Sequence, residues 1–257
     1  MPAERLAATT IGSGRRVVLV HGFTQTAHSW HDLAARLAAC HEVMAVDAPG
    51  HGGSADVRAD LVTGAALLGA TGGRATYIGY SMGARLCLHL AVALPDLVER
   101  LVLISGTAGL DEEADRAARR SSDETLAASL ERDGLDAFLE RWVAQPMFAG
   151  LGDPDLDDRR RNTVAGLAAS LRLAGTGTQE PLWSRLGGLA MPVLVVAGAH
   201  DAKFVAAGQR MASLLPHATF AIVEGAGHTV HREQPERFAE LLDQWLAHTA
   251  AGRTATS

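Results

Sequence analysis

The sequence predicts an α/β fold in which a mostly parallel sheet is flanked by helices and interrupted by a helical insertion. Short runs of β-branched and aliphatic residues alternate with helix-like segments through the first hundred residues. These runs are apolar throughout, which is typical of strands that helices cover on both faces. Between about residues 110 and 186 no strand-like run occurs, and charged, alanine-rich stretches take over.

The strand-like runs end at glycine, proline, serine or aspartate, which are typical turn residues. They lie at residues 17–20, 42–46, 76–79, 101–104, 193–197 and 219–223. Apolar residues at helical spacing predict the helices between and after them. These helices lie at residues 28–40, 81–93, 205–215 and 235–248. This alternation predicts strands that run parallel.

The middle third of the chain predicts an all-helical lid. Helical stretches are expected at residues 111–120, 124–143 and 156–172. The capping-box spacing of Ser121 and Glu124 indicates that a helix starts there. We therefore divide the chain into a core, residues 1–106 and 189–257, and a lid insertion, residues 107–188. An insertion at this point lies over the carboxyl ends of the strands, where open α/β sheets bind ligands.

Composition argues against several functional classes. The formal net charge of −6 and the pI near 6.0 disfavour a nucleic-acid partner, which requires a basic face. The longest apolar run is far shorter than the ~20 residues that span a bilayer. Cys40 and Cys87 make neither a disulfide framework nor a metal cluster. Residues 1–10 lack a secretory pattern, so we expect a cytoplasmic protein. We also expect a monomer or a small homo-oligomer that binds neither a metal nor a membrane.

The motif Gly79-Tyr80-Ser81-Met82-Gly83 directly follows a predicted strand and opens a predicted helix. This is the context of a nucleophile elbow, a tight turn whose small flanking residues let the serine project from the top of the sheet. A chance match is the alternative, and the strand–turn–helix context argues against it. We therefore predict that Ser81 is the reactive serine.

A reactive serine needs a histidine that takes its proton. His228 lies in a glycine-rich loop just after the strand-like run 219–223, so it can reach over the carboxyl edge of the sheet. His217 precedes that run, and His248 lies near the chain end. His231 is interpreted as a structural or rim residue. Position therefore favours His228 as the catalytic base.

The histidine in turn needs a carboxylate that orients it. Asp201 follows the strand-like run 193–197 and precedes His228 in the chain, which is the order expected on this kind of scaffold. Asp47 also ends a strand, but its neighbours indicate a structural turn near the site. The sequence therefore favours Asp201.

An oxyanion hole needs two hydrogen-bond donors aimed at one point. The residue after the serine supplies one backbone N–H, here that of Met82. The loop after the first strand-like run begins with His21-Gly22, and the N–H of Phe23 is the second candidate. His21-Gly22 alone would indicate an ordinary turn, but together with the elbow it favours the oxyanion role.

Taken together, these motifs resemble the α/β-hydrolase superfamily over about residues 14–248. Within it, the chain is similar to the 2-succinyl-6-hydroxy-2,4-cyclohexadiene-1-carboxylate synthases of menaquinone biosynthesis. The more specific matches are Arg85 after the elbow, Asp201-Ala202-Lys203-Phe204, and Trp142 with Gln145-Pro146-Met147-Phe148. The elbow and the His21-Gly22 loop are common to the whole superfamily.

This resemblance implies a lyase that needs no metal or organic cofactor. Its substrate, 2-succinyl-5-enolpyruvyl-6-hydroxy-3-cyclohexene-1-carboxylate, loses a ring proton and then pyruvate. Ser81, activated by His228 and oriented by Asp201, would be the base. The N–H groups of Phe23 and Met82 would stabilise the charge that develops on the succinyl carbonyl.

The implied substrate is a small anion with several carboxylates, which suit the planar guanidinium of arginine. Arg85 lies one helical turn past Ser81, so it can point into the same cavity. The resemblance adds Tyr80, Arg119, Trp142 and Arg161 as binding residues. A shift of register would replace Arg119 by Arg120, or Arg161 by Arg159 or Arg160, and the sequence leaves that choice open.

Two other functions use the same residues or the same fold. One is a carboxylesterase, thioesterase or C–C hydrolase that forms a covalent intermediate on Ser81. The other is a non-catalytic receptor built on the hydrolase fold. The complete set of candidate catalytic residues argues against a receptor.

Overall fold

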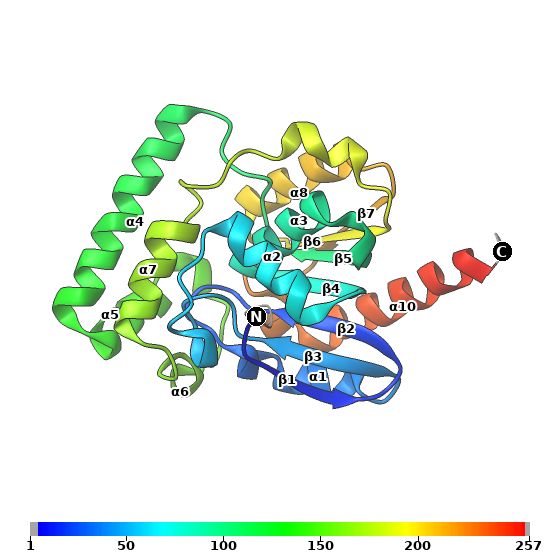
Figure 1. Cartoon of the computed structure of the whole chain (residues 1–257), viewed down its shortest axis with the longest axis horizontal. Helices are drawn as coiled ribbons and strands as arrows, with labels where there is room; N and C mark the ends of the chain where they lie inside the picture. The colour runs from blue at the N-terminus through cyan, green and yellow to red at the C-terminus, as the bar shows by residue number, and fades with distance from the viewer. Residues whose placement is uncertain (1–4, 255–257) are drawn as a thin grey trace.

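A seven-stranded sheet forms the centre of the computed structural model, which describes residues 5–254 and the side chains of residues 5–249. The strand order is β1-β3-β2-β4-β5-β6-β7. The edge strand β1 runs antiparallel to β3, and the other neighbours are parallel. The predicted α/β fold with a mostly parallel sheet is confirmed (Figure 1).

The six predicted strands are present, each slightly longer than expected. The strands are β1 (Ala8–Gly12), β2 (Arg15–Val20), β3 (His41–Val46), β4 (Ala75–Tyr80), β5 (Val98–Ile104), β6 (Val193–Gly198) and β7 (Ala218–Val223). Strand β1 was not predicted, because its side chains are all exposed and its sequence carries no apolar run.

Helices cover both faces of the sheet. The longer ones are α1 (His31–Leu37), α2 (Leu61–Gly72), α3 (Met82–Ala93), α8 (Ala202–Leu214) and α10 (Pro235–Thr254), and α9 (Val230–Glu233) is a single turn. Short 3-10 turns lie at Ala27–Trp30, Gly52–Ser54, Pro95–Leu97, Pro146–Phe148 and Trp183–Gly188.

Alternate residues of the central strands pack into two separate cores. Val18 and Val20 of β2 face α2, α3 and α8, whereas Val17 and Leu19 face α1 and α10. This two-sided burial explains why the strands are apolar throughout. Helix α2 was not predicted, because its sequence, LVTGAALLGATG, is apolar or small almost all round and lacks helical periodicity.

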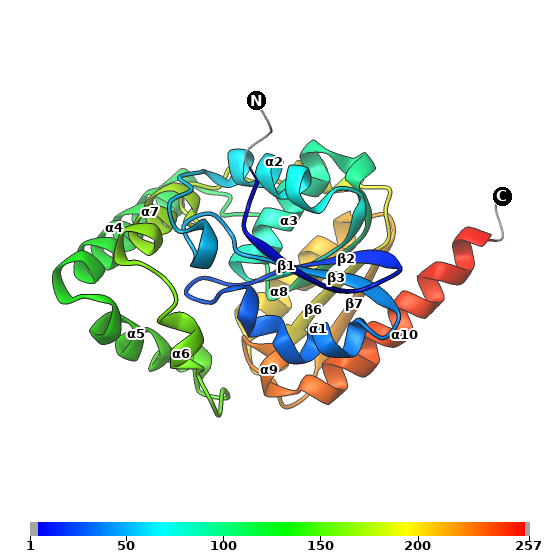
Figure 2. The same cartoon turned by 60° about the horizontal axis from the view of Figure 1, so that its bottom comes forward.

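The chain between β5 and β6 is helical, as predicted, and lies beside the sheet (Figures 1 and 2). It contains α4 (Glu113–Asp133), α5 (Leu135–Val143), α6 (Leu156–Arg159) and α7 (Val164–Ala174). These helices have a small core of their own, in which Leu130, Phe138 and Leu167 are buried. We keep the name lid insertion for residues 107–188.

The predicted helix start at Ser121 is wrong. Helix α4 runs unbroken through Ser121 and Glu124 and stops at Gly134, which has a φ of +81°. A capping-box spacing is also compatible with a helix interior, whereas a left-handed backbone is readily adopted by glycine and ends the helix.

No helix within residues 5–254 is both long enough and apolar enough to cross a membrane.

The first turn of α3 packs directly on the backbone of β2. A Cβ atom at Gly83 would meet the carbonyl oxygens of Val20 and His21, and one at Gly79 would meet the backbone of Gly83 and Ala84. Both glycines of the elbow motif are therefore required by close backbone approach.

We expect Gly83→Ala to destabilise the protein by about 1–3 kcal/mol, because backbone atoms cannot move aside as a side chain can. Urea unfolding followed by circular dichroism measures this change. Gly188→Ala is the control, because a Cβ there would meet nothing within 4 Å. Equal unfolding midpoints for the two variants would contradict the packing argument.

Candidate active site

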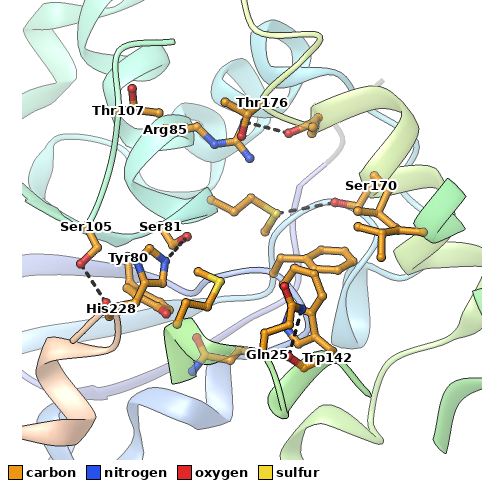
Figure 3. A pocket seen from close by; sticks show the side chains of 18 of the residues that line it. Gln25, Tyr80, Ser81, Arg85, Ser105, Thr107, Trp142, Ser170, Thr176 and His228 are labelled. Carbon is orange, nitrogen blue, oxygen red and sulfur yellow. Dashed lines mark hydrogen bonds between the residues drawn. The ribbon is translucent and has the colours of Figure 1, made fainter. Parts of the chain in front are cut away.

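Ser81 lies between the end of β4 and the start of α3, with a φ of +52°. This left-handed conformation is costly for a residue other than glycine and is common at functional sites. Its hydroxyl Oγ is 3.0 Å from Nε2 of His228, and Nδ1 of His228 is 2.7 Å from Oδ2 of Asp201. The structure thus brings the predicted serine, histidine and carboxylate into one hydrogen-bonded chain (Figure 3 draws Ser81 and His228).

The loop that carries His228 is held from both sides. The hydroxyl of Ser105 donates to the backbone carbonyl of His228 at 2.8 Å. The carboxylate of Glu233 accepts from the N–H groups of Gly227 at 2.7 Å and Thr229 at 2.8 Å. These contacts fix the buried imidazole before any substrate arrives.

This arrangement suits proton transfer from the serine. With the Asp201 carboxylate accepting a hydrogen bond from Nδ1, the lone pair of Nε2 faces the Ser81 hydroxyl. His228 can then take the hydroxyl proton, and the nearby carboxylate stabilises the imidazolium that forms.

The residues of the two predicted oxyanion donors, Phe23 and Met82, line one cavity together with Ser81. Met82 is the first residue of α3, where N–H groups lack intrahelical acceptors and the helix dipole is positive. Within residues 5–254, no backbone acceptor for the N–H of Phe23 or of Met82 is found. Both N–H groups are therefore available to a bound oxyanion.

His21 fixes the start of the loop that carries Phe23. Its Nε2 accepts from the Ala48 N–H at 3.0 Å, and its Nδ1 lies 2.8 Å from the Gly22 carbonyl and donates to it. Full burial lowers the pKa of His21, so the ring is neutral and can accept at one nitrogen while it donates at the other. We call residues 21–27 the oxyanion loop.

A cavity of about 290 Å³ opens at Ser81 and His228 and lies between the sheet and the lid insertion. Figure 3 shows Ser81, His228, Arg85 and Trp142 around this hollow. Of the predicted binding residues, the structure brings Tyr80, Arg85, Arg119 and Trp142 to its lining. No cluster of metal-ligating side chains occurs among the described residues.

Arg85 and Arg119, which line the cavity, are each held by a hydrogen bond to the chain itself. Nη1 of Arg85 donates to the Ala174 carbonyl at 2.9 Å. Burial lowers the pKa of Arg85 to about 10, which leaves it charged at neutral pH. Nε of Arg119 donates to the buried carboxylate of Asp123 at 2.8 Å, so its two Nη groups remain for a ligand.

The structure does not bring Arg161 to the cavity, and this prediction needs correction. The Arg161 side chain is exposed, whereas Arg159 is 2% exposed and lines the cavity. Arg159 is the last residue of the single turn α6, and Arg161 lies two residues further along the chain, where its side chain does not share the direction of Arg159. The phase of this turn decides which arginine of the run faces inward.

Lys203 also lines the cavity, with Nζ 5.6 Å from the centre of the Phe204 ring. From the sequence alone, Lys203 has no predicted chemical role. Its position two residues after Asp201, as the only lysine of the chain, was the available signal.

His231 packs behind the site. Its ring stacks on Trp30 at 4.4 Å between centroids and lies 4.7 Å from the ring of Tyr80. Burial, with the positive charge of Arg232 nearby, lowers the pKa of His231 to about 3. The ring is therefore neutral in the folded protein at the pH of ordinary assays.

Comparisons with known proteins show the family to which the chain belongs. The model of the alpha/beta hydrolase family matches residues 17–241. A Bacillus subtilis protein provisionally named 2-succinyl-6-hydroxy-2,4-cyclohexadiene-1-carboxylate synthase is 42% identical over 176 residues, which are 66% of this chain and 64% of that protein. The Salmonella typhimurium protein of the same name is 32% identical over 90% of this chain and 93% of its own length. The structure of MenH from S. aureus superposes with a TM-score of 0.88 at 28% identity, covering 95% of this chain and 98% of that one.

The pH dependence of stability tests the burial of His231. In the unfolded chain a histidine takes up a proton near pH 6.5, but in the fold His231 does so only near pH 3. As the pH falls from 6.5 toward 3, the unfolded state therefore binds one more proton at this position. The contribution of His231 to the free energy of unfolding should then fall by about 1.4 kcal/mol for each pH unit in this range.

We expect His231→Phe, which keeps the aromatic contact with Trp30, to flatten this pH dependence by about that amount. Urea unfolding at pH 7.5, 6 and 5 measures it. His217→Phe, at an exposed position, is the matched control. An unchanged slope in the His231 variant would refute the assignment.

Proposed function

The chain belongs to the alpha/beta hydrolase family and, within it, to the 2-succinyl-6-hydroxy-2,4-cyclohexadiene-1-carboxylate synthases, and we propose that its cavity carries out their elimination of pyruvate. The observation that carries this proposal is the grouping of Arg85, Arg119 and Arg159 around the cavity that Ser81 faces. A general esterase pocket has no need of such a concentration of guanidinium groups.

The substrate has a carboxylate on the ring, one on the succinyl group and one on the enolpyruvyl group. Arginine binds carboxylates through paired N–H groups, and this binding is strong when water is excluded. Arg85 comes from the core, whereas Arg119 and Arg159 come from the lid insertion. We propose that the lid insertion, residues 107–188, thereby holds the substrate over Ser81, with Tyr80 and Trp142 packing against it.

In the first chemical step, the Ser81 hydroxyl passes its proton to Nε2 of His228 and takes a proton from the ring carbon beside the succinyl carbonyl. The electron pair of that C–H bond moves onto the carbonyl oxygen, and the N–H groups of Phe23 and Met82 stabilise the oxyanion. Asp201 stabilises the imidazolium of His228.

In the second step, the electron pair returns from the oxyanion into the ring. The ring double bond shifts by one position, a second double bond forms, and the C–O bond to the enolpyruvyl group breaks. Enolpyruvate leaves, takes up the proton that the His228 imidazolium gives back, and becomes pyruvate. No bond to Ser81 forms, so the serine acts as a base throughout.

Release of pyruvate tests the proposal directly. The enolpyruvyl substrate is made freshly by the enzyme that precedes these synthases in menaquinone biosynthesis and is added to the protein. Pyruvate is followed with lactate dehydrogenase and NADH. We expect rapid release, and a decrease of about 10²–10⁴-fold in kcat for Ser81→Ala and for His228→Ala. Release no faster than the spontaneous rate, together with rapid turnover of p-nitrophenyl esters, would instead establish a hydrolase.

The corrected position of the third arginine gives a separate prediction. Arg159→Ala should lower kcat/KM, because a buried charged contact to a substrate carboxylate is lost. The loss should correspond to an increase of about 2–4 kcal/mol in the transition-state free energy. Arg161→Ala, two residues away and exposed, should change it by less than about 0.5 kcal/mol. Steady-state kinetics of both variants measure the two changes. A larger effect at Arg161 than at Arg159 would show that Arg161 is the substrate-binding residue, as the sequence resemblance implies.

A further inference from the structure

A buried polar cluster ties the lid insertion to the oxyanion loop. The carboxylate of Asp158, in α6, is 1% exposed. Its Oδ2 accepts from the Thr26 N–H at 3.1 Å, and its Oδ1 accepts from the Thr26 hydroxyl. Both oxygens of a buried carboxylate are thus used by one residue that lies 132 positions away in the chain.

Asn162 makes a second connection just after α6. It is 5% exposed. Its Nδ2 donates to the Thr24 carbonyl at 2.7 Å and to the Arg159 carbonyl at 2.9 Å, and its Oδ1 accepts from the Gly52 N–H at 3.0 Å. The Arg159 guanidinium in turn donates to the hydroxyl of Thr24. Thr24 is therefore held through both its side chain and its carbonyl.

Thr24 needs this support because its φ is +70°. The left-handed region is costly for a β-branched residue, and such a conformation persists only where neighbours over-determine it. The start of the loop is held within the loop itself, where Gln25 Oε1 accepts from the Gly22 N–H at 3.1 Å. Its end is held by the core, where Asp47 Oδ1 accepts from the Ala27 N–H at 2.7 Å. The middle of the loop is held by the lid insertion.

Phe23, whose N–H is one of the two oxyanion donors of the proposed function, directly precedes Thr24. We propose that Asp158 and Asn162 are positioning residues that aim the Phe23 N–H at the oxyanion through Thr24 and Thr26. This inference rests on the proposed function for its substrate but not for its geometry. Neither residue is among those that line the cavity, so they act without touching the substrate.

The consequence for kinetics is specific. A misdirected donor weakens binding of the charge that develops in the transition state, which affects kcat, and leaves the carboxylate contacts of the bound substrate in place. We expect Asp158→Ala and Asn162→Ala to lower kcat about 10- to 100-fold, with KM changed less than about threefold. Thermal unfolding, measured on the same samples, shows that each variant is folded at the assay temperature.

Two further variants separate positioning from general damage. Asp158→Asn can accept from the Thr26 N–H and donate to the Thr26 hydroxyl, so it should recover most of the kcat lost in Asp158→Ala. Asp157→Ala is the matched control, because Asp157 is the neighbouring carboxylate of α6 and its side chain is 93% exposed. It should keep the kinetics of the unchanged protein.

A probe without carboxylates makes the test independent of the proposed substrate. An alkyl fluorophosphonate reacts with Ser81: the serine oxygen bonds to phosphorus, fluoride leaves, and the hydroxyl proton goes to His228. The P=O oxygen occupies the oxyanion hole. Intact-mass measurement should show labelling about tenfold slower in Asp158→Ala and Asn162→Ala, and unchanged in Asp157→Ala.

The outcomes are distinguishable. If pyruvate release is absent from the unchanged protein but the labelling difference is present, the proposed function fails and the positioning role stands. If kcat and labelling are both unchanged, or if KM alone rises, the positioning role is overturned. If Asp158→Asn is as impaired as Asp158→Ala, the hydrogen bonds to Thr26 are not the cause, and the inference fails for Asp158.

Discussion

The close packing of α3 against the end of β2 is the contact on which the rest of the site depends. Gly83 lies on the carbonyls of Val20 and His21, so the chain must turn sharply out of β4. That turn places Ser81 in the left-handed region and leaves the first N–H groups of α3 without acceptors. One steric constraint therefore exposes the serine hydroxyl and orients an oxyanion donor beside it.

The core and the lid insertion contribute different physical parts. The core supplies the hydrogen-bonded chain from Ser81 through His228, whose geometry is fixed by buried contacts. The lid insertion supplies two of the three cavity arginines, and its α6 segment holds the oxyanion loop. A net charge of −6 is compatible with a cationic cavity, because three arginines line it and no aspartate or glutamate of the described residues does.

The sequence predicted the buried strands well, because strands covered on both faces must be apolar throughout. It failed where that signal is absent. Strand β1 is exposed on every residue, and α2 has no polar face to mark its period. The break expected at Ser121 lies instead at Gly134, because a capping-box spacing does not require a helix to start, whereas a left-handed glycine does end one.

The fold class and the candidates for serine, histidine and carboxylate follow from sequence patterns, since an elbow motif is local and strand ends of a parallel sheet share one edge. The tertiary structure alone decided that Arg159 rather than Arg161 faces the cavity and that Asp158 holds Thr26. Both depend on the phase of one short turn and on contacts between segments far apart in the chain. Local patterns carry no information about either.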